Sequence, residues 1–173
     1  MKPSPAYKTA LTGILAALTL AVSVLERAVS ATLPLPPGVR LGLSNVAVTF
    51  CCVELGLPYA MAIILIKAGF ILLVSGPIAG FISVSGGVLS VLAVFAVKKL
   101  LKDRVSYFGI CVFSAVCHNV GQILAASASV GSAMYFASAP LLILAGIVFG
   151  LVTGAVLSAV GPAMKKVLER ERK

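Results

Sequence analysis

Three hydrogen-bonding side chains interrupt an apolar run in the second half of the chain. The segment from Ser114 to Ala125 reads SAVCHNVGQILA, so His118, Asn119 and Gln122 stand among apolar residues, and His118 is the single histidine. On a helix, residues three and four apart are neighbours, so these side chains share one flank. Imidazole and amide groups can bind a solute, but they can equally tie two membrane helices together. The segment alone leaves both interpretations open.

Composition identifies the class of protein. Of the 173 residues, 60% are apolar and only 11% are charged. This composition is typical of an integral membrane protein, and because a spanning helix takes about 20 residues, the chain has no room for a separate soluble module. The net charge of +9 comes from short basic clusters at the ends of hydrophobic segments, where anionic lipid explains it better than nucleic acid. We expect the lipid bilayer as a partner, and no nucleic acid.

Six hydrophobic segments follow one another along the chain, separated by prolines, glycines and charged clusters. Each is apolar enough for a membrane helix. We therefore predict an all-α integral membrane protein that forms a single domain over residues 1–173. The six transmembrane helices are predicted at residues 7–31, 41–57, 58–74, 78–97, 105–128 and 134–164.

The basic residues predict the orientation of these helices. Apart from Arg27, Arg40 and Lys67, every lysine and arginine falls at the N-terminus, in the connection at residues 98–104, or in the C-terminal tail. With six spans these three regions lie on one side, which the positive-inside rule assigns to the cytoplasm. Both termini are therefore predicted to be cytoplasmic.

Polar side chains on four of the predicted helices fall at a similar depth. Since a helix rises about 1.5 Å per residue, depth can be counted from either end. The count predicts a polar pocket that opens toward the outside and is closed on the cytoplasmic side by apolar packing. The predicted substrate-binding residues are Arg40, Ser44, Asn45, Lys67, Ser85, His118, Asn119 and Gln122.

The charges of this pocket predict the kind of ligand. Arg40 and Lys67 supply positive charge, and we expect no acidic residue near them in the outer half of the membrane. Because an unpaired charge at membrane depth is costly, a bound anion would compensate it. An anionic or phosphate-bearing solute is therefore favoured.

Catalysis and metal binding have little support in the sequence. Cys51 and Cys52 are adjacent and diverge around a helix, Cys111 and Cys117 also diverge, and no CxxC or HExxH pattern is present. His118 is the single candidate base, with no aspartate or glutamate near it in sequence. We expect no enzyme activity, no metal and no cofactor.

A stripe of small residues follows one face of the first predicted helix. Gly13, Ala17 and Ala21 recur every four residues. Such stripes let another helix approach closely. The stripe could serve packing within this chain or docking to another membrane subunit.

Three longer segments resemble a known membrane family. They are RLGLSNVAV at residues 40–48, SGPIAGFISVSGGVLS at residues 75–90 and SAVCHNVGQILA at residues 114–125. They are similar to the Gx transporter family, whose members often carry the label heptaprenyl diphosphate synthase component I. That family is itself similar to the S-components of energy-coupling factor transporters, which are six-helix proteins that capture a substrate.

The resemblance implies partner subunits, and the chain differs from the family at one position. S-components dock on a T-component with paired ATPases, commonly through an AxxxA pattern on the first helix, which Ala17 and Ala21 match. The chain itself has no P-loop motif for ATP. The family usually has an arginine where this chain has Lys67, and a lysine cannot make the same bidentate contact.

Residues and resemblance together predict a substrate-binding subunit, similar to an S-component, that spans the bacterial cytoplasmic membrane several times. Its ligand would be a small anionic solute of vitamin-like, flavin-like or prenyl-diphosphate type. The alternative is a non-transporting membrane subunit that assists isoprenoid or quinone synthesis or an electron-transfer assembly.

Overall fold

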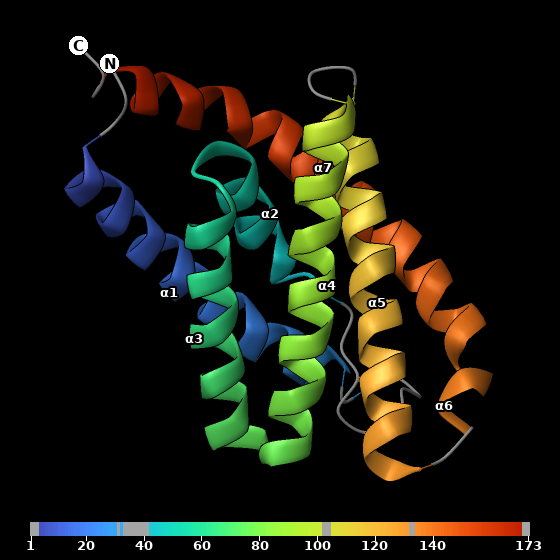
Figure 1. Ribbon diagram of the computed structural model, residues 1–173. Coiled ribbons are helices and arrows are strands. Elements are labelled where there is room, and N and C mark those ends of the chain that lie inside the picture. Colours follow the sequence, from blue (N-terminus) through green and yellow to red (C-terminus); the bar gives the residue numbers. More distant parts are fainter. Residues whose placement is uncertain (1–3, 31, 33–41, 102–104, 132–133, 171–173) are drawn as a thin grey trace.

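The computed structural model describes residues 4–30, 32, 42–101, 105–131 and 134–170, and nearly all of them are helical (Figure 1). The helices are α1 (Pro5–Ser30), α2 (Asn45–Glu54), α3 (Leu57–Ser75), α4 (Pro77–Leu101), α5 (Tyr107–Val130), α6 (Met134–Ala137) and α7 (Ala139–Arg170). Five of them, namely α1, α3, α4, α5 and α7, are long and apolar enough to cross a membrane. The predicted all-helical membrane bundle is confirmed.

The second predicted span is shorter than expected. The apolar segment at residues 41–57 forms only the ten-residue helix α2, which at about 1.5 Å per residue covers roughly half of a 30 Å hydrocarbon core. Gly42 and Gly56 bracket it with φ angles of 90° and 104°. These left-handed conformations do not continue an α-helix, and glycine adopts them without strain. The backbone geometry at the two glycines therefore limits α2 to ten residues.

The short helix α2 forms the centre of the bundle. It contacts all five long helices, and eight of its ten residues are buried, from Asn45 to Val53 with Val46 excepted. Phe50 and Cys51 pack in one hydrophobic core with Ile63 of α3 and Val91 of α4. The other helices therefore cover α2 on nearly all sides.

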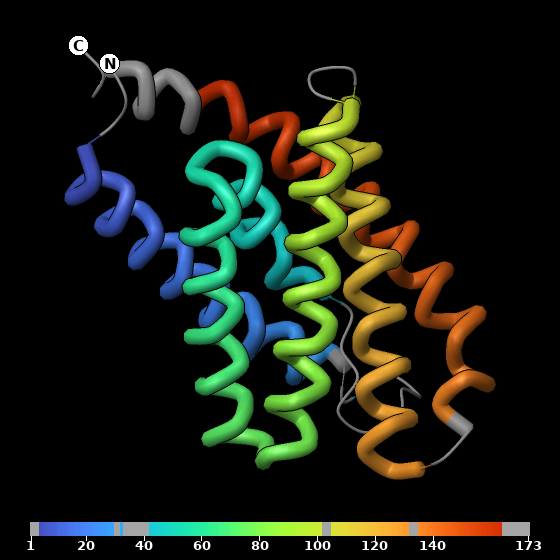
Figure 2. The backbone as a smooth tube through the Cα atoms, viewed as in Figure 1, coloured from blue at the N-terminus to red at the C-terminus, as the bar shows by residue number. Residues whose placement is uncertain are grey.

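The other helices surround α2 as a curved row. In the order α3, α4, α5 and α7, each packs most extensively on the next, while α1 covers α2 and α3 (Figures 1 and 2). Small residues permit the closest of these contacts. A Cβ atom added to Gly150 of α7 would lie 2.5 Å from the Cα of Val112 on α5. The absence of a side chain at Gly150 thus permits α5 and α7 to pack closely.

The last predicted span, residues 134–164, is divided in two. Helix α6 ends at Ala137 and α7 begins at Ala139. Ser138 forms the turn between them, and its N–H donates to the carbonyl of Tyr135 at 3.2 Å. Pro140 lies in the first turn of α7, where the missing N–H of a proline is tolerated. The remaining predicted spans agree closely with α1, α3, α4 and α5.

The ends of the helices alternate between the two ends of the bundle. The start of α1, the turn from α2 to α3, and the end of α4 lie together, whereas the turn from α3 to α4 lies at the opposite end (Figure 2). The predicted orientation assumed that successive connections alternate between the two sides of the membrane, and this arrangement is consistent with that assumption. The cytoplasmic position of the termini itself stays a prediction.

Candidate functional site

A buried lysine is the first element of the candidate site. Lys67 lies within the spanning helix α3, its side chain is 5% exposed, and its Nζ donates a hydrogen bond to Asn45 Oδ1 at 3.2 Å. Asn45 is the first residue of α2. A cation at this depth is rare in membrane helices and usually marks a functional site. The central helix and α3 thus meet through a polar contact inside an otherwise apolar bundle.

The second element is a pair on α5. The Nε2 atoms of His118 and Gln122 lie 2.7 Å apart, as residues four apart on one helix can. Which of the two groups donates depends on the tautomer of the imidazole. Both side chains are no more than 2% exposed. The contact therefore fixes the orientation of the two side chains relative to each other.

Gly42 lies where the two elements meet. A Cβ atom at this position would be 3.4 Å from both Asn45 Nδ2 and His118 Cδ2. Asn45, the partner of Lys67, and His118 therefore both border Gly42. Asn45 Nδ2 has no hydrogen-bond partner among the described residues. The junction thus combines a cation, an imidazole and an unsatisfied amide donor, which together suit a hydrogen-bond acceptor or an anion.

Asn119 points toward a different neighbour from His118. Its Nδ2 donates to the backbone carbonyl of Leu142 on α7 at 2.6 Å, while its Oδ1 finds no partner in the described part of the chain. The side chain is fully buried. Asn119 therefore ties α5 to α7, in line with the alternative that polar side chains join helices.

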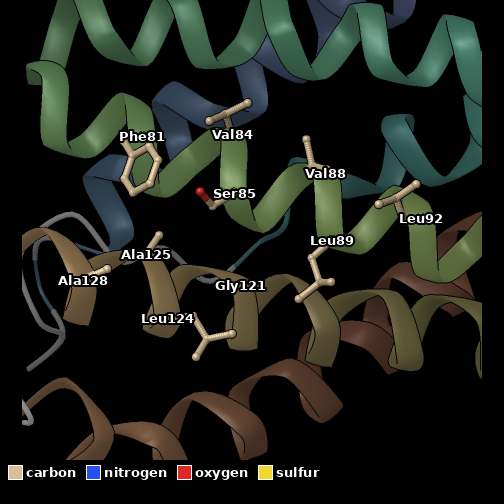
Figure 3. A pocket seen from close by; sticks show the side chains of 10 residues that line it. All are labelled: Phe81, Val84, Ser85, Val88, Leu89, Leu92, Gly121, Leu124, Ala125 and Ala128. Carbon is tan, nitrogen blue, oxygen red and sulfur yellow. The ribbon is translucent and has the colours of Figure 1, made fainter.

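Ser85 lies away from this cluster. It lines an apolar groove of about 500 Å³ between α4 and α5, where it is the single polar side chain (Figure 3). The neighbouring Gly86 faces the cluster instead, since a Cβ atom there would be 2.9 Å from Gln122 Cγ and 3.0 Å from His118 Cε1. The residues that line the groove are Phe81, Val84, Ser85, Val88, Leu89, Leu92, Gly121, Leu124, Ala125 and Ala128.

Glu26 is a buried acid that the sequence reasoning missed, and the expectation of no acid near the predicted site was wrong. Its side chain is 1% exposed, and it accepts hydrogen bonds from the backbone of Gly42 and from Ser44. The sequence did contain one indication of this burial. Thr19, Ser23 and Glu26 follow one another at intervals of four and three residues, so they share one face of α1, and all three are buried. A polar stripe on one face of a membrane helix indicates the face that packs inward.

The half of the bundle that was predicted to face the cytoplasm also contains polar groups that were not expected. The hydroxyl of Ser114 on α5 lies 2.7 Å from that of Ser90 on α4 and 3.3 Å from that of Thr49 on α2. All three residues are buried. Their hydroxyls satisfy one another, so they join three helices without offering a charged group to a ligand.

The remaining predicted residues lie at the surface or outside the described chain. Arg40 lies outside the described residues. Gly13, Ala17 and Ala21 are exposed on α1, and a Cβ atom added to Gly13 would meet nothing within 4 Å. Within the described chain, no three histidine, cysteine, aspartate or glutamate side chains gather as metal ligands would.

The fold and the site define a class: a multi-pass membrane protein with a polar cluster buried at the centre of its helical bundle. The model of the heptaprenyl diphosphate synthase component I family matches residues 15–160. The chain therefore belongs to this family. No curated protein matches the chain, and no solved structure does.

Proposed function

We propose that this protein is a substrate-binding subunit of S-component type that takes up a small anionic solute across the cytoplasmic membrane of a bacterium. The observation that carries the proposal is Lys67, a cation buried within a spanning helix, whose partner Asn45 borders Gly42 together with His118. Ionisable side chains within membrane spans are costly to bury and usually have a functional role. Ligand binding is the function that this cost supports best.

The surrounding polar atoms support a solute with several hydrogen-bonding groups. Asn45 Nδ2 is a buried donor that lacks a partner within the described chain. Buried polar groups are nearly always satisfied, so an unpaired one next to a cation suits a ligand oxygen. Lys67 supplies the charge, and Asn45, His118 and Gln122 fix the orientation. The resulting candidates are a vitamin-like, flavin-like or prenyl-diphosphate anion.

The solute can be identified from the purified protein. We expect that protein isolated in mild detergent releases one anionic compound on extraction with organic solvent, in an amount close to one molecule per chain, as detected by mass spectrometry. A mock purification from cells without the protein should lack the compound. Recovery of a neutral or cationic compound alone, or of none from cells grown in rich medium, would contradict the proposal.

The family name favours a second candidate function. It describes a component of a synthase and thus implies a partner component. On that alternative the chain is a non-transporting membrane subunit that assists isoprenoid or quinone synthesis or an electron-transfer assembly. Copurification of a prenyl synthase, rather than of a transporter module, would favour the second candidate.

Uptake needs an energy source, which we assign to a separate T-component with paired ATPases. The exposed stripe of Gly13, Ala17 and Ala21 is the proposed docking face. Ala17→Leu or Ala21→Leu should abolish copurification with the transporter module, because the larger side chains keep the two helices apart. The solute content of the isolated subunit should not change.

The matched control for docking is Ala155→Leu. Ala155 is also exposed, but on α7, so this change adds the same volume to another face. It should leave copurification intact. Unimpaired transport by Ala17→Leu and Ala21→Leu would remove the docking proposal.

A further inference from the structure

The central helix α2 begins inside the bundle, where Ser44 and Asn45 are buried. The first N–H groups and the last C=O groups of any helix lack partners within it. Spanning helices place these ends near water, but α2 is ten residues long and surrounded by five helices. Its terminal groups therefore need partners from other helices.

The N-terminal end of α2 is capped by a side chain from α1. Glu26 Oε1 accepts the Gly42 N–H, and Oε2 accepts the Ser44 hydroxyl at 2.9 Å and the Ser44 N–H at 3.3 Å. The side chain of Ser44, which stands at the N-cap position, makes no capping hydrogen bond of its own. All three groups donate, so they suit an ionised carboxylate.

The C-terminal end of α2 is held by a charge of the opposite sign. Lys98 of α4 donates a hydrogen bond from Nζ to the carbonyl of Val53, in the last turn of α2. A negative charge at the N-terminus and a positive charge at the C-terminus both match the helix dipole. The two ends of the helix are thus fixed by two different neighbouring helices.

We infer that Glu26 is a positioning residue for the candidate site. The carboxylate fixes Gly42 and Ser44, and the next residue, Asn45, accepts from Lys67. Gly42 also borders His118. Glu26 therefore holds two of the residues that border the junction of Asn45 and His118. Its role in solute binding rests on the proposed function, whereas its role in fixing α2 does not.

The buried thiols of the chain provide a local test. Cys51 and Cys52 lie on α2 and Cys111 on α5, and all three are at most 4% exposed. In Glu26→Gln the charge is lost, which weakens three charge-assisted hydrogen bonds. We expect the rate at which N-ethylmaleimide labels Cys51 and Cys52 to rise about tenfold or more. Labelling of Cys111, followed by peptide mass spectrometry in the same sample, should change by less than about twofold.

Two further variants complete the test. Glu54→Gln removes a carboxylate at the other end of α2, which accepts a hydrogen bond from the hydroxyl of Tyr107 at 3.4 Å. This variant should leave the labelling ratio unchanged. If Glu26→Gln does not fold, Ser44→Ala removes one of the three donors and should raise the Cys51 and Cys52 rates to a lesser extent. An unchanged rate, or an equal rise at Cys111, would overturn the inference.

The same samples separate the two proposals. Loss of the copurifying anion from Glu26→Gln, together with local labelling of α2, supports both the position and the function. Suppose that Glu26→Gln raises the labelling rate of Cys51 and Cys52 alone, but that no anion copurifies with either the natural protein or the variant. Glu26 would then still be the residue that anchors α2, and the proposed solute site would be rejected. Full anion content with locally labelled α2 would show that Glu26 does not position the site.

Discussion

Lys67→Met should weaken binding of the copurifying anion by roughly 2 to 5 kcal/mol, which corresponds to about 30-fold to several thousandfold in dissociation constant. The physical reason is that the variant leaves a buried anion without its cation while keeping a side chain of similar length. His118→Gln should cost less, because the neutral imidazole contributes hydrogen bonds that an amide can partly replace. Calorimetry on the purified variants measures both affinities.

Two controls make the result specific for Lys67. Lys99→Met removes an exposed lysine from α4 and should leave the affinity unchanged. Lys67→Arg keeps the charge and should retain most of the binding. If Lys67→Met folds and binds as tightly as the natural protein, the lysine is structural and the ligand need not be an anion.

Gly150→Ala should lower the free energy of unfolding by about 1 to 3 kcal/mol, the usual cost of overpacking. The added Cβ atom would lie 2.5 Å from the Cα of Val112 and 3.1 Å from its N. Backbone atoms cannot rotate away as a side chain can, so α5 and α7 must separate. The melting temperature in detergent should fall by about 2 to 12 °C.

The control for Gly150 is the same substitution at Gly13. A Cβ atom at Gly13 would meet nothing within 4 Å, and alanine favours a helix over glycine by about 1 kcal/mol. Gly13→Ala should therefore be neutral or slightly stabilising. Equal melting temperatures for the two variants would contradict the close α5–α7 contact.

The long helices could be predicted because the signal for each is local. A run of apolar residues between breakers is enough to indicate α1, α3, α4 and α5, and the boundaries agree closely. The length of α2 could not be predicted in this way. It depends on the left-handed conformation of a glycine near each end. It also depends on charged side chains of α1 and α4, which lie outside α2 in the sequence.

The sequence predicted how deep in the membrane the site residues lie, but not toward which neighbouring helix each side chain points. Counting residues along α2 and α3 put Asn45 and Lys67 at one level, and the structure has them in contact. Depth does not say which way a side chain points around its helix. Ser85 is at a suitable level but faces the apolar groove, and Asn119 turns toward α7. Direction is set by tertiary packing, which a single sequence does not show.

Glu26 could be recognised only with its partners in view. A glutamate near the end of an apolar helix resembles an interfacial residue, and the neighbouring Arg27 strengthens that impression. Its burial follows from Gly42 and Ser44, which lie 16 and 18 residues further along the chain. The charge balance near the candidate site therefore had to come from the structure.

The shortness of α2 has a consequence for biosynthesis. A ten-residue segment is too short to stay in the bilayer as an independent stop-transfer element, whereas α3 has 19 residues and can. Leu55 and Gly56 alone connect the two helices, so they must enter the membrane together as one helical hairpin. The hydrogen bond between Lys67 and Asn45 lies within that hairpin. The lysine thus carries its first polar partner with it during insertion, before α4 and α5 are available to shield it from lipid.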